Sequence, residues 1–428
     1  MANYPLFGEC EVLVCGGGPA GTAAAITAGR NNLKTILIEK NGFLGGNLTA
    51  AGIDTIYGLY TIGEKPKKII GGVTDEIIQN LTNQNACYTR ENTYGAGNGL
   101  TFLVEPMKVE LETLVLNAGG KILYHTFGVD AFKENNGSYA CVIASKSGLQ
   151  IIRTKIIVDT TGDADLIARA GGKFEKAADS KDVQSCTTVF YMANVNVSKA
   201  KSFGKQNIWE KMREVNQSGE FDLPRLEGSF HATLYPSMIE ANMTRIANVD
   251  TTDNSSVTDA EIQGRLQAQN YTNFLIKYIP GFENAFLVKT GCQLGMREGR
   301  RIIGKYVLNK EDIISGRKFP DSITRCSQPI EDHLAGKNTR WIYVGENDYY
   351  DIPYRCILPS NLDGFITAGR CLSATHDAHA SARSSGTAFS LGQAAGMASA
   401  LSIKKNVPLA DINIQDLQGD LRKIGAIL

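Results

Sequence analysis

A short apolar run near the start of the chain, Val12 to Cys15, is followed by a cluster of glycines and then by an Ala-rich stretch. An apolar run of this length beside a turn signal predicts a buried strand, and the Ala-rich stretch predicts a helix packed on it. A second apolar run, Lys34 to Ile38, predicts the neighbouring strand. The order strand, turn, helix, strand is typical of a parallel sheet covered by helices.

Three further elements continue this pattern. Apolar residues at helical spacing predict a helix from Met107 to Asn117, which ends at Gly119-Gly120. Residues 127–153 alternate between apolar and polar positions around two turn signals, which predicts a small antiparallel meander. The run from Ile156 to Val158 predicts another strand.

Two regions interrupt the pattern. Residues 53–99 are rich in Gly, Asn, Tyr and Thr around one helix predicted from Val73 to Leu81, and we interpret them as an insertion that covers a cofactor. Residues 173–278 contain strand-like positions and a long amphipathic helix expected over 250–279. We interpret this second region as a substrate-side domain, whose Tyr, Phe, Asn and Ser content suits a polar, uncharged ligand.

The glycines after the first strand carry the main chemical signal. Gly16, Gly18 and Gly21 have the spacing that allows a tight turn, a close backbone approach to a pyrophosphate and close helix packing on the strand. Glu39 ends the second strand, where a carboxylate accepts hydrogen bonds from a ribose and repels a 2′-phosphate. An ordinary glycine-rich turn would leave Glu39 unexplained. We therefore predict a dinucleotide site that disfavours NADP.

The loop after Glu39 begins at Lys40 and contains Gly45, Gly46 and Asn47. It is either a flexible surface loop or a second place where the backbone approaches a cofactor. With the glycine motif and Glu39, it resembles the flavoproteins of glutathione-reductase-like FAD fold, in which these three features line an extended FAD. The resemblance favours FAD over NAD, which the glycine motif alone does not distinguish.

A second loop, with Gly162 and Asp163, follows the strand at 156–158. Either its backbone N–H groups and a carboxylate lie at the carboxyl edge of the sheet, where ligands bind, or Asp163 or Asp165 caps the next helix. Both interpretations stay open for the side chains. For the Gly162 backbone we favour proximity to the cofactor.

Three arginines fall within residues 295–304, which we interpret as helical. On a helix, Arg297 and Arg301 share a face. The segment is either a solvated charged helix with Glu298 and Glu311 as partners, or one of these two arginines points inward to an anionic substrate group or a reduced flavin. Arginine suits the second role because its planar fork binds anions in a bidentate way.

The C-terminal region predicts a strand at 364–368, the pair Gly369-Arg370, and a helix of small residues through Gly392 and Gln393. The N-terminus of this helix is suited to contact with an anionic reduced flavin, because the helix dipole is positive there.

Two of the five histidines, His376 and His379, lie between that strand and that helix, and they are our first candidates for general acid or base. The alternative is that they cap the helix or pack beneath the flavin. Tyr354 and Arg297 are secondary candidates for orienting the substrate. A metal is not expected, because the His-x-x-His pair lacks a further clustered ligand at a set spacing.

Three C-terminal stretches, LGMREGRRIIGKYVL, IPYR and AGRCLSATHDAHASAR, closely resemble a bacterial family of FAD-dependent oxidoreductases with the box AGRCxSATHxAxxSxR. The resemblance covers residues 11–60, 105–175 and 290–400. It implies an α/β fold with a glutathione-reductase-like, Rossmann-type FAD-binding domain and an inserted α+β substrate domain. Most glutathione-reductase-like flavoproteins have Gly-Asp where this chain has Gly369-Arg370, so the contact to the ribityl chain stays unassigned.

The expected domains are the first part of the FAD-binding domain at 1–175, with an insertion at about 53–99, a substrate or cap domain at 176–290, and the last part of the FAD-binding domain at 291–428. The residues expected at the FAD are Gly16, Gly18, Pro19, Ala20, Gly21, Glu39, Lys40, Gly45, Gly46, Asn47, Gly162, Asp163, Gly369, Arg370, Ser381, Gly392 and Gln393.

The amino-acid composition limits the classes of binding partner that we expect. Lysine plus arginine equals aspartate plus glutamate, 44 against 44, so no net charge recruits nucleic acid or an anionic membrane. Nine cysteines without a CxxC pair fit small buried residues of a reducing compartment. No signal peptide or membrane-spanning run is visible, and we expect a cytoplasmic protein. A homo-oligomer and a separate electron-transfer partner both stay open.

One dinucleotide motif and no second nucleotide domain predict that the substrate or a separate donor reduces the flavin. We expect an enzyme that transfers a hydride between flavin N5 and a small polar substrate, with hydroxylated or carbohydrate-like molecules preferred. The alternative is a flavin monooxygenase or a flavoprotein that acts in a complex with a partner.

Overall fold

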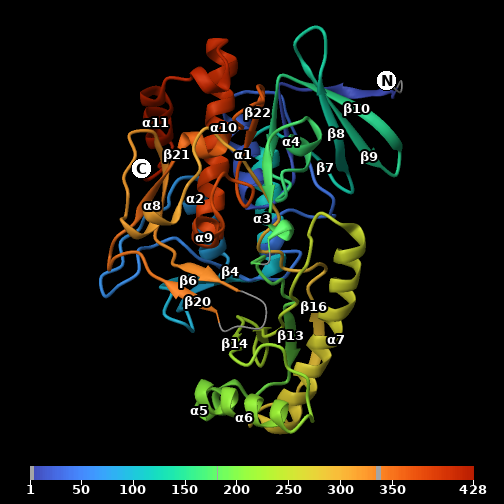
Figure 1. The fold of residues 1–428 in the computed structure, drawn as a ribbon, viewed down its shortest axis with the longest axis vertical. Coiled ribbons are helices and arrows are strands. Elements are labelled where there is room, and N and C mark those ends of the chain that lie inside the picture. Colours follow the sequence, from blue (N-terminus) through green and yellow to red (C-terminus); the bar gives the residue numbers. More distant parts are fainter. Residues whose placement is uncertain (1–3, 181, 334–338) are drawn as a thin grey trace.

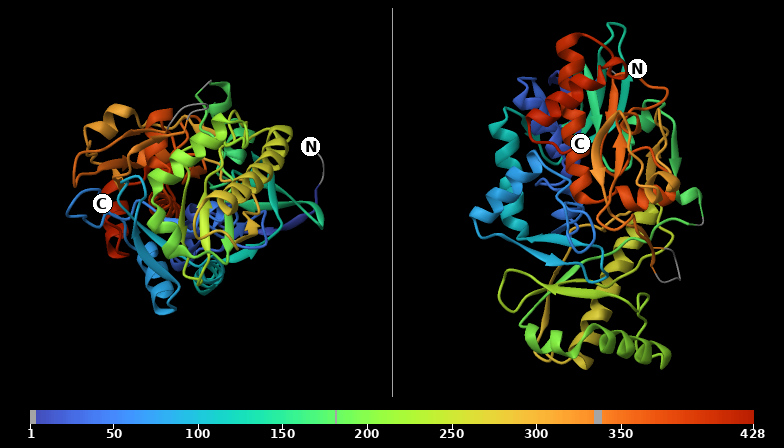
Figure 2. Two further views of the ribbon diagram at one scale, coloured as in Figure 1. Left: turned by 90° about the horizontal axis from the view of Figure 1, so that it is seen from below. Right: turned by 90° about the vertical axis from the view of Figure 1, so that its left-hand side faces the viewer.

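The computed structural model describes residues 4–180, 182–333 and 339–428. The chain forms two lobes along its longest axis, and both chain ends belong to the upper lobe in the view of Figure 1. The views of Figure 2 show the same separation, with the segment from about residue 190 to 290 in the other lobe.

The upper lobe is built on a parallel sheet with strand order β22-β11-β2-β3-β7. Its strands are β2 (Val12–Cys15), β3 (Thr35–Ile38), β7 (Lys121–Leu123), β11 (Ile156–Asp159) and β22 (Phe365–Thr367). Along β2, Val12 and Val14 pack into the core on one face, and Leu13 and Cys15 pack into a second core on the other. Burial on both faces explains the unbroken apolar run, and the predicted parallel sheet is confirmed.

Helices cover the first face of this sheet. They are α1 (Pro19–Arg30), α3 (Val104–Asn117) and α10 (Ser385–Lys405), with α2 (Val73–Asn83) packed on these three helices and α11 (Ile414–Lys423) packed on α10. The close approach of α1 and α10 depends on small residues. A Cβ atom on Gly392 would lie 1.9 Å from the carbonyl oxygen of Ala20, and one on Gly396 would lie 2.5 Å from that of Ala24.

The second face is covered by a smaller sheet with order β1-β10-β9-β8 and by a short helix. These elements are β1 (Leu6–Glu9), β8 (Phe127–Lys133), β9 (Tyr139–Ser145), β10 (Gly148–Thr154) and α4 (Asp165–Arg169). The strands β8, β9 and β10 form the antiparallel meander expected from the alternating pattern and its turn residues.

The lower lobe has an antiparallel sheet with order β14-β15-β13-β16 and a hydrophobic core of its own. Its elements are β13 (Phe190–Ala193), α5 (Val197–Phe203), α6 (Lys205–Gln217), β14 (Ser229–Ala232), β15 (Ile239–Asn242), α7 (Asn254–Tyr278) and β16 (Phe286–Thr290). The predicted long helix is confirmed as α7, and the Asp253 side chain caps it by accepting from Ser256 N at 2.8 Å. The exact domain boundaries stay a prediction.

Two further groups of short strands and helices complete the described fold. Residues 53–102 contribute β4 (Thr55–Ile56), β5 (Cys87–Glu91) and β6 (Asn98–Phe102) as one antiparallel sheet. The C-terminal part adds β18 (Ser322–Cys326) paired with β21 (Tyr350–Pro353), β19 (Ile330–Asp332) paired with β20 (Arg340–Ile342), α8 (Lys310–Ile314) and α9 (His376–Ala382).

Residues 295–304 are extended, so the helix predicted there is wrong. The segment ends in β17 (Arg300–Ile302), which pairs with β12 (Phe174–Lys176). Close tertiary packing decides this conformation, because a Cβ atom on Gly299 would lie only 1.7 Å from a carboxylate oxygen of Asp163. Glu298 is fully buried instead of lying on a solvated helix face.

No helix within the described ranges has both the length and the apolar character needed to cross a lipid bilayer.

Candidate functional site

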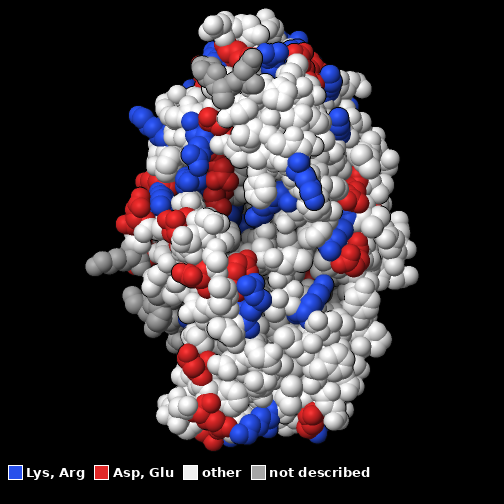
Figure 3. All heavy atoms as spheres, turned by 90° about the vertical axis from the view of Figure 1, so that its right-hand side faces the viewer, with Lys and Arg blue, Asp and Glu red and all other residues white. Residues whose placement is uncertain are grey.

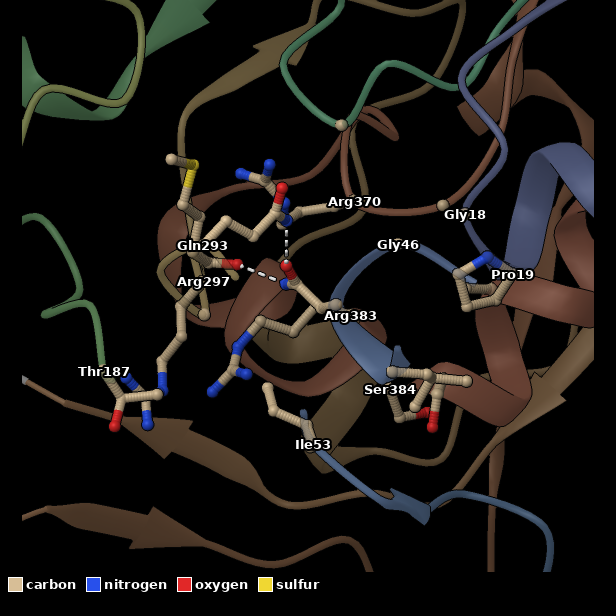
Figure 4. Close-up of a pocket in the computed structure, with 18 of the residues that line it drawn as sticks. Gly18, Pro19, Gly46, Ile53, Thr187, Gln293, Arg297, Arg370, Arg383 and Ser384 are labelled. Carbon is tan, nitrogen blue, oxygen red and sulfur yellow. Dashed lines mark hydrogen bonds between the residues drawn. The ribbon is translucent and has the colours of Figure 1, made fainter. Parts of the chain in front are cut away.

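A cavity of about 640 Å³ lies between the lobes and is lined by residues of both. Figure 4 shows Gly18, Pro19 and Gly46 on one side of it, and Thr187 and Arg297 on the other, with Arg383 between them. On the face drawn in Figure 3, the surface is hollowed at mid-height and charged side chains of both signs stand around the hollow. The cavity therefore has two ends with different linings.

Glycines build the first end, which we call the dinucleotide end (Gly16, Gly18, Pro19, Ala20, Glu39 and Gly46). Gly16 has a φ of +102°, and a Cβ atom there would lie 2.4 Å from the carbonyl oxygen of Thr160. A Cβ atom on Gly21 would lie 1.8 Å from the Gly16 oxygen, so Gly21 serves helix packing and does not line the cavity. In contrast, the nearest atom to a Cβ on Gly18 would be Gly46 Cα at 3.9 Å, which leaves open space beside the backbone.

The N-terminus of α1 faces this space without a capping side chain. Gly18 is the N-cap residue and Pro19 opens the helix. Among the residues that the structure describes, no side chain caps the first-turn N–H groups. These donors have no partner within a helix and carry its positive dipole end. A pyrophosphate fits this position on both hydrogen bonding and charge.

Glu39 is held by the backbone of the two loops. Its Oε2 accepts from Gly17 N at 2.7 Å and its Oε1 accepts from Asn41 N at 2.8 Å. The side chain is buried and lines the cavity beside Lys40. Each carboxylate oxygen keeps a further lone pair, so Glu39 can accept from a ribose hydroxyl while it fixes both loops.

The Gly-Gly loop lies against the dinucleotide end, as expected. Gly46 has a φ of +52° and lines the cavity with Asn47, whereas Gly45, at φ +110°, turns the chain just outside it. Asn47 links the loop to the lower lobe, because its Nδ2 donates to Met296 O at 2.9 Å and its Oδ1 accepts from Gln293 at 3.3 Å.

The loop after β11 holds an ion pair that the sequence did not reveal. Asp163 accepts from Arg370 at 2.9 Å and 3.2 Å, and Thr251 donates to the same carboxylate. Neither Asp163 nor Asp165 caps α4. The buried Asp159 does so instead, by accepting from the N–H groups of the first turn, and burial raises its pKa to about 6.

This ion pair shapes the cavity wall around Gly162, Asp163, Gly369 and Arg370, which all line the cavity. Gly162 has a φ of +91°, and a Cβ atom there would lie 2.7 Å from an Arg370 nitrogen. The departure from the Gly-Asp pair is therefore matched by Asp163, an acid in the loop after the neighbouring strand β11, which pairs with Arg370.

Some residues predicted at the site lie outside the cavity lining. Gly392 packs on Ala20, and the Gln393 side chain accepts from Val73 N at 2.7 Å, so both organise helix packing. The buried Tyr354 hydroxyl donates to Leu409 O at 2.9 Å. Ser381 does line the cavity, but its hydroxyl is already bonded to Tyr350 and to the Gln328 carbonyl.

His376 and His379 also lie outside the lining, so they are replaced as candidates for proton transfer. His376 is held between Glu298, at 2.9 Å, and Asp332, at 3.1 Å. Burial opposes its protonation, but the hydrogen bonds to the two carboxylates outweigh burial and raise its pKa to about 9. His379 is fully buried against Arg370 O at 2.7 Å, and burial lowers its pKa to about 3.

Side chains from distant segments build the second end of the cavity, which we call the polar chamber. Its titratable residues are Asp54, Arg90, Arg225, His231, Glu240, Arg297, Glu331, His333 and Arg383. Of these, only Arg297 was a sequence candidate. Arg383 could have been identified from the sequence, because it is the last residue of the AGRCxSATHxAxxSxR box. In contrast, His231 lies in a region without a motif.

His231 lies between two carboxylates in this chamber. Its Nε2 is 2.8 Å from Asp54 and its Nδ1 is 3.0 Å from Glu240. Burial opposes protonation of the ring, but the charges of Glu240 and Asp54 outweigh burial and raise the pKa of His231 to about 9. Burial also raises the pKa of Glu240. The group can therefore store a proton next to a bound ligand.

Arg297 and Arg383 enter the chamber beside Glu331 and His333. Arg297 donates to Ser185 O at 2.6 Å, and Arg383 donates to Glu331 O at 3.2 Å. Burial would raise the pKa of Glu331, but the hydrogen bond to His333 and the charges of the two arginines lower it to about 2, so Glu331 is ionised. His333 is neutral, because burial lowers its pKa well below the ordinary value.

Comparisons with known proteins agree with this site. Residues 11–421 match the FAD dependent oxidoreductase family. A digeranylgeranylglycerophospholipid reductase from Picrophilus torridus is 26% identical over 44% of this chain, and the match spans only 47% of that reductase. A thiamine thiazole synthase from Saccharolobus islandicus is 28% identical over 44% of this chain and 72% of the synthase.

Among solved structures, a geranylgeranyl bacteriochlorophyll reductase-like protein from Thermoplasma acidophilum matches 97% of this chain and 83% of its own, with 14% identity and a TM-score of 0.47. The family match covers nearly the whole chain, and the dinucleotide end fits the cofactor that the family uses. The chain therefore belongs to the FAD dependent oxidoreductase family, and FAD is its cofactor.

Proposed function

We propose that this protein oxidises or reduces a small, polar, hydroxylated or carbohydrate-like substrate that binds in the polar chamber. The observation that carries the proposal is one continuous cavity, which begins at the FAD-binding glycines and ends among charged and hydrogen-bonding side chains. A substrate in the chamber is thus in the same enclosed space as the cofactor.

When bound, FAD supplies hydride-transfer chemistry. The chain's own contribution at the dinucleotide end is binding and orientation. The open backbone at Gly18 and the uncapped start of α1 receive the pyrophosphate, and Glu39 receives a ribose. Thr161, Gly162 and Arg370 line the wall farther along the cavity.

In the polar chamber, the Asp54, His231 and Glu240 group handles the proton that accompanies oxidation of an alcohol or reduction of a carbonyl. Both ring nitrogens of His231 face a carboxylate, so the proton is exchanged with the substrate through Asp54 or Glu240, which also line the cavity. The raised pKa of Glu240 makes this carboxylate a stronger base than an exposed one.

The charged side chains of the chamber disfavour long apolar chains as substrates, although a relative of this chain is named as a lipid reductase. Tyr57, Arg90 and His231 would lose hydration without gaining partners if an isoprenoid filled the chamber. The proposed substrate therefore differs from that of the named relative.

The test is anaerobic mixing of the yellow holoprotein with sugars, polyols and hydroxy acids while the flavin absorbance near 450 nm is recorded. Bleaching by one class of compound supports the proposal and names that class. If no compound bleaches the flavin, and the chemically reduced protein reacts with oxygen much faster when an aromatic substrate is present, a monooxygenase replaces it.

A further inference from the structure

The polar chamber contains a group of arginines without a matching number of acids. Arg297 has no carboxylate within 4.0 Å among the described residues, and Arg383 has one at that limit, Glu331. Both guanidinium groups point into the same part of the cavity, away from Gly18 and Pro19 (Figure 4). Arg225 lines the same chamber from the lower lobe.

Several other charged groups in and around the chamber have neighbours of opposite charge. The charges of Arg90 and the protonated His231 are balanced by those of Asp54 and Glu240, and Arg90 donates to Thr55 and Thr101. The carboxylates of Glu298 and Asp332, which lie near Arg383, are bound to His376, Arg301 and Arg340. The group of Arg297, Arg383 and Glu331 therefore has two positive charges and one negative charge. Arg225 adds a further positive charge, because the carboxylate beside it, Glu227, also pairs with Arg245.

Burial makes this excess of positive charge energetically unfavourable unless a bound anion compensates it. Burial and the charges of Arg383 and Arg225 lower the pKa of Arg297 to about 9, which is the direction expected for a guanidinium that lacks an anionic partner. The Nε atom of Arg383 is buried without a hydrogen-bond partner among the described residues. A buried donor of this kind is expected to have a partner when the site is filled.

We propose that Arg297 and Arg383 bind a carboxylate group of the substrate. This inference rests on the proposed function and narrows its substrate class to small hydroxylated acids, instead of the uncharged ligands favoured by the composition of residues 173–278. The planar fork of arginine matches a carboxylate.

The experiment is isothermal titration calorimetry of the oxidised holoprotein with acetate, lactate, malonate, succinate and benzoate, each beside its neutral amide, and with inorganic phosphate. We expect at least one carboxylate to bind and its amide to fail. Arg297→Met and Arg383→Met should each weaken that binding at least tenfold. The matched control is Arg30→Met, which removes the same charge from an exposed pair with Glu76.

The flavin content and visible spectrum of each variant show whether it still binds FAD. If Arg297→Met does not retain FAD, Arg297→Lys keeps the charge without the fork and should give intermediate affinity. Absence of carboxylate binding by the wild type, equal binding by the arginine variants, or tighter binding of phosphate would each overturn the inference.

Two further outcomes distinguish substrate binding by these arginines from a role at the reduced cofactor, and the anion site from the proposed reaction. A change in the flavin midpoint potential in both variants, with no carboxylate binding, would assign the arginines to the reduced cofactor and overturn the inference. Carboxylate binding that depends on Arg297 and Arg383, without bleaching by any compound, would sustain the anion site and remove the proposed reaction.

Discussion

The two ends of the cavity are built by different means. At the dinucleotide end, the cavity is lined by backbone groups from two short loops and by one carboxylate, Glu39, which all lie within 40 residues of one another. In the polar chamber, side chains from β14, β15, the segment before β17 and the end of α9 converge. Backbone geometry suits a constant cofactor, whereas side chains can be exchanged to suit a substrate.

The largest effect that tests this comparison is expected from His231→Gln, which removes the stored proton from the chamber. Turnover should fall about 100- to 10,000-fold, the range for loss of a general acid or base, while FAD content stays unchanged. Anaerobic stopped-flow reduction measures the rate. His376→Gln is the control, since His376 lies outside the cavity. The comparison fails if His376→Gln abolishes turnover and His231→Gln preserves it.

Gly392→Ala tests whether the small residues of α10 serve helix packing. The added methyl group would meet the Ala20 carbonyl at 1.9 Å, so the free energy of unfolding should fall by about 3 kcal/mol. Urea denaturation measures this change. The matched control is Gly419→Ala in α11, where nothing lies within 4 Å of the new atom, and stability should rise by up to about 1 kcal/mol. Equal effects at both positions would contradict the packing role.

Glu39→Ala tests the dinucleotide end. The substitution removes the acceptor for Gly17 N and Asn41 N together with the ribose contact, and FAD affinity should fall about 100-fold, because charged hydrogen bonds are worth about 1.5–3 kcal/mol each. Fluorescence titration of the apoprotein with FAD gives the affinity. The control is Glu105→Ala, at an exposed pair with Lys108. Unchanged FAD affinity in Glu39→Ala would exclude the ribose role.

The smallest effect concerns the pH dependence of stability. The folded-state pKa of His376, about 9, is above its ordinary value of 6.5. The contribution of protonated His376 to the stability of the folded protein is therefore complete below pH 6.5 and disappears as the pH rises through 9. Compared with His376→Gln, the wild type should be more stable by about 1–2 kcal/mol at pH 6, less than the full shift because the ring is partly exposed.

Thermal denaturation of both proteins with excess FAD, at intervals from pH 6 to pH 9.5, measures this difference. A gap between the two proteins that widens with rising pH would show that His376 is not protonated in the folded state.

Local sequence predicted the elements whose signals are local. The buried run of β2, the Gly-Gly end of α3 and the long helix α7 follow from periodicity and capping residues. The segment at 295–304 was mistaken for a helix because charged residues at helical spacing are also found in extended chains. Contact between Gly299 and Asp163, which are far apart in sequence, overrides that spacing.

In the candidate site, too, the residues of local motifs were predicted, whereas the orientation of other side chains was not. Gly16, Gly18, Glu39 and Gly46 line the cavity as the motif spacing predicted. His376 and His379 stood next to a cofactor motif in sequence, yet their rings turn toward Glu298 and the Arg370 carbonyl. Nearness along the chain does not decide which way a side chain points from a short helix.

By itself, the sequence determined that this chain holds a dinucleotide, because a strand, three spaced glycines and an acid form one contiguous unit whose geometry depends on local conformation. Only the tertiary structure decided what faces the ligand at the other end. Asp54, His231 and Glu240 come from segments separated by up to 186 residues of chain. Their electrostatic roles exist only after folding removes them from water and places both carboxylates within 3.0 Å of the His231 ring.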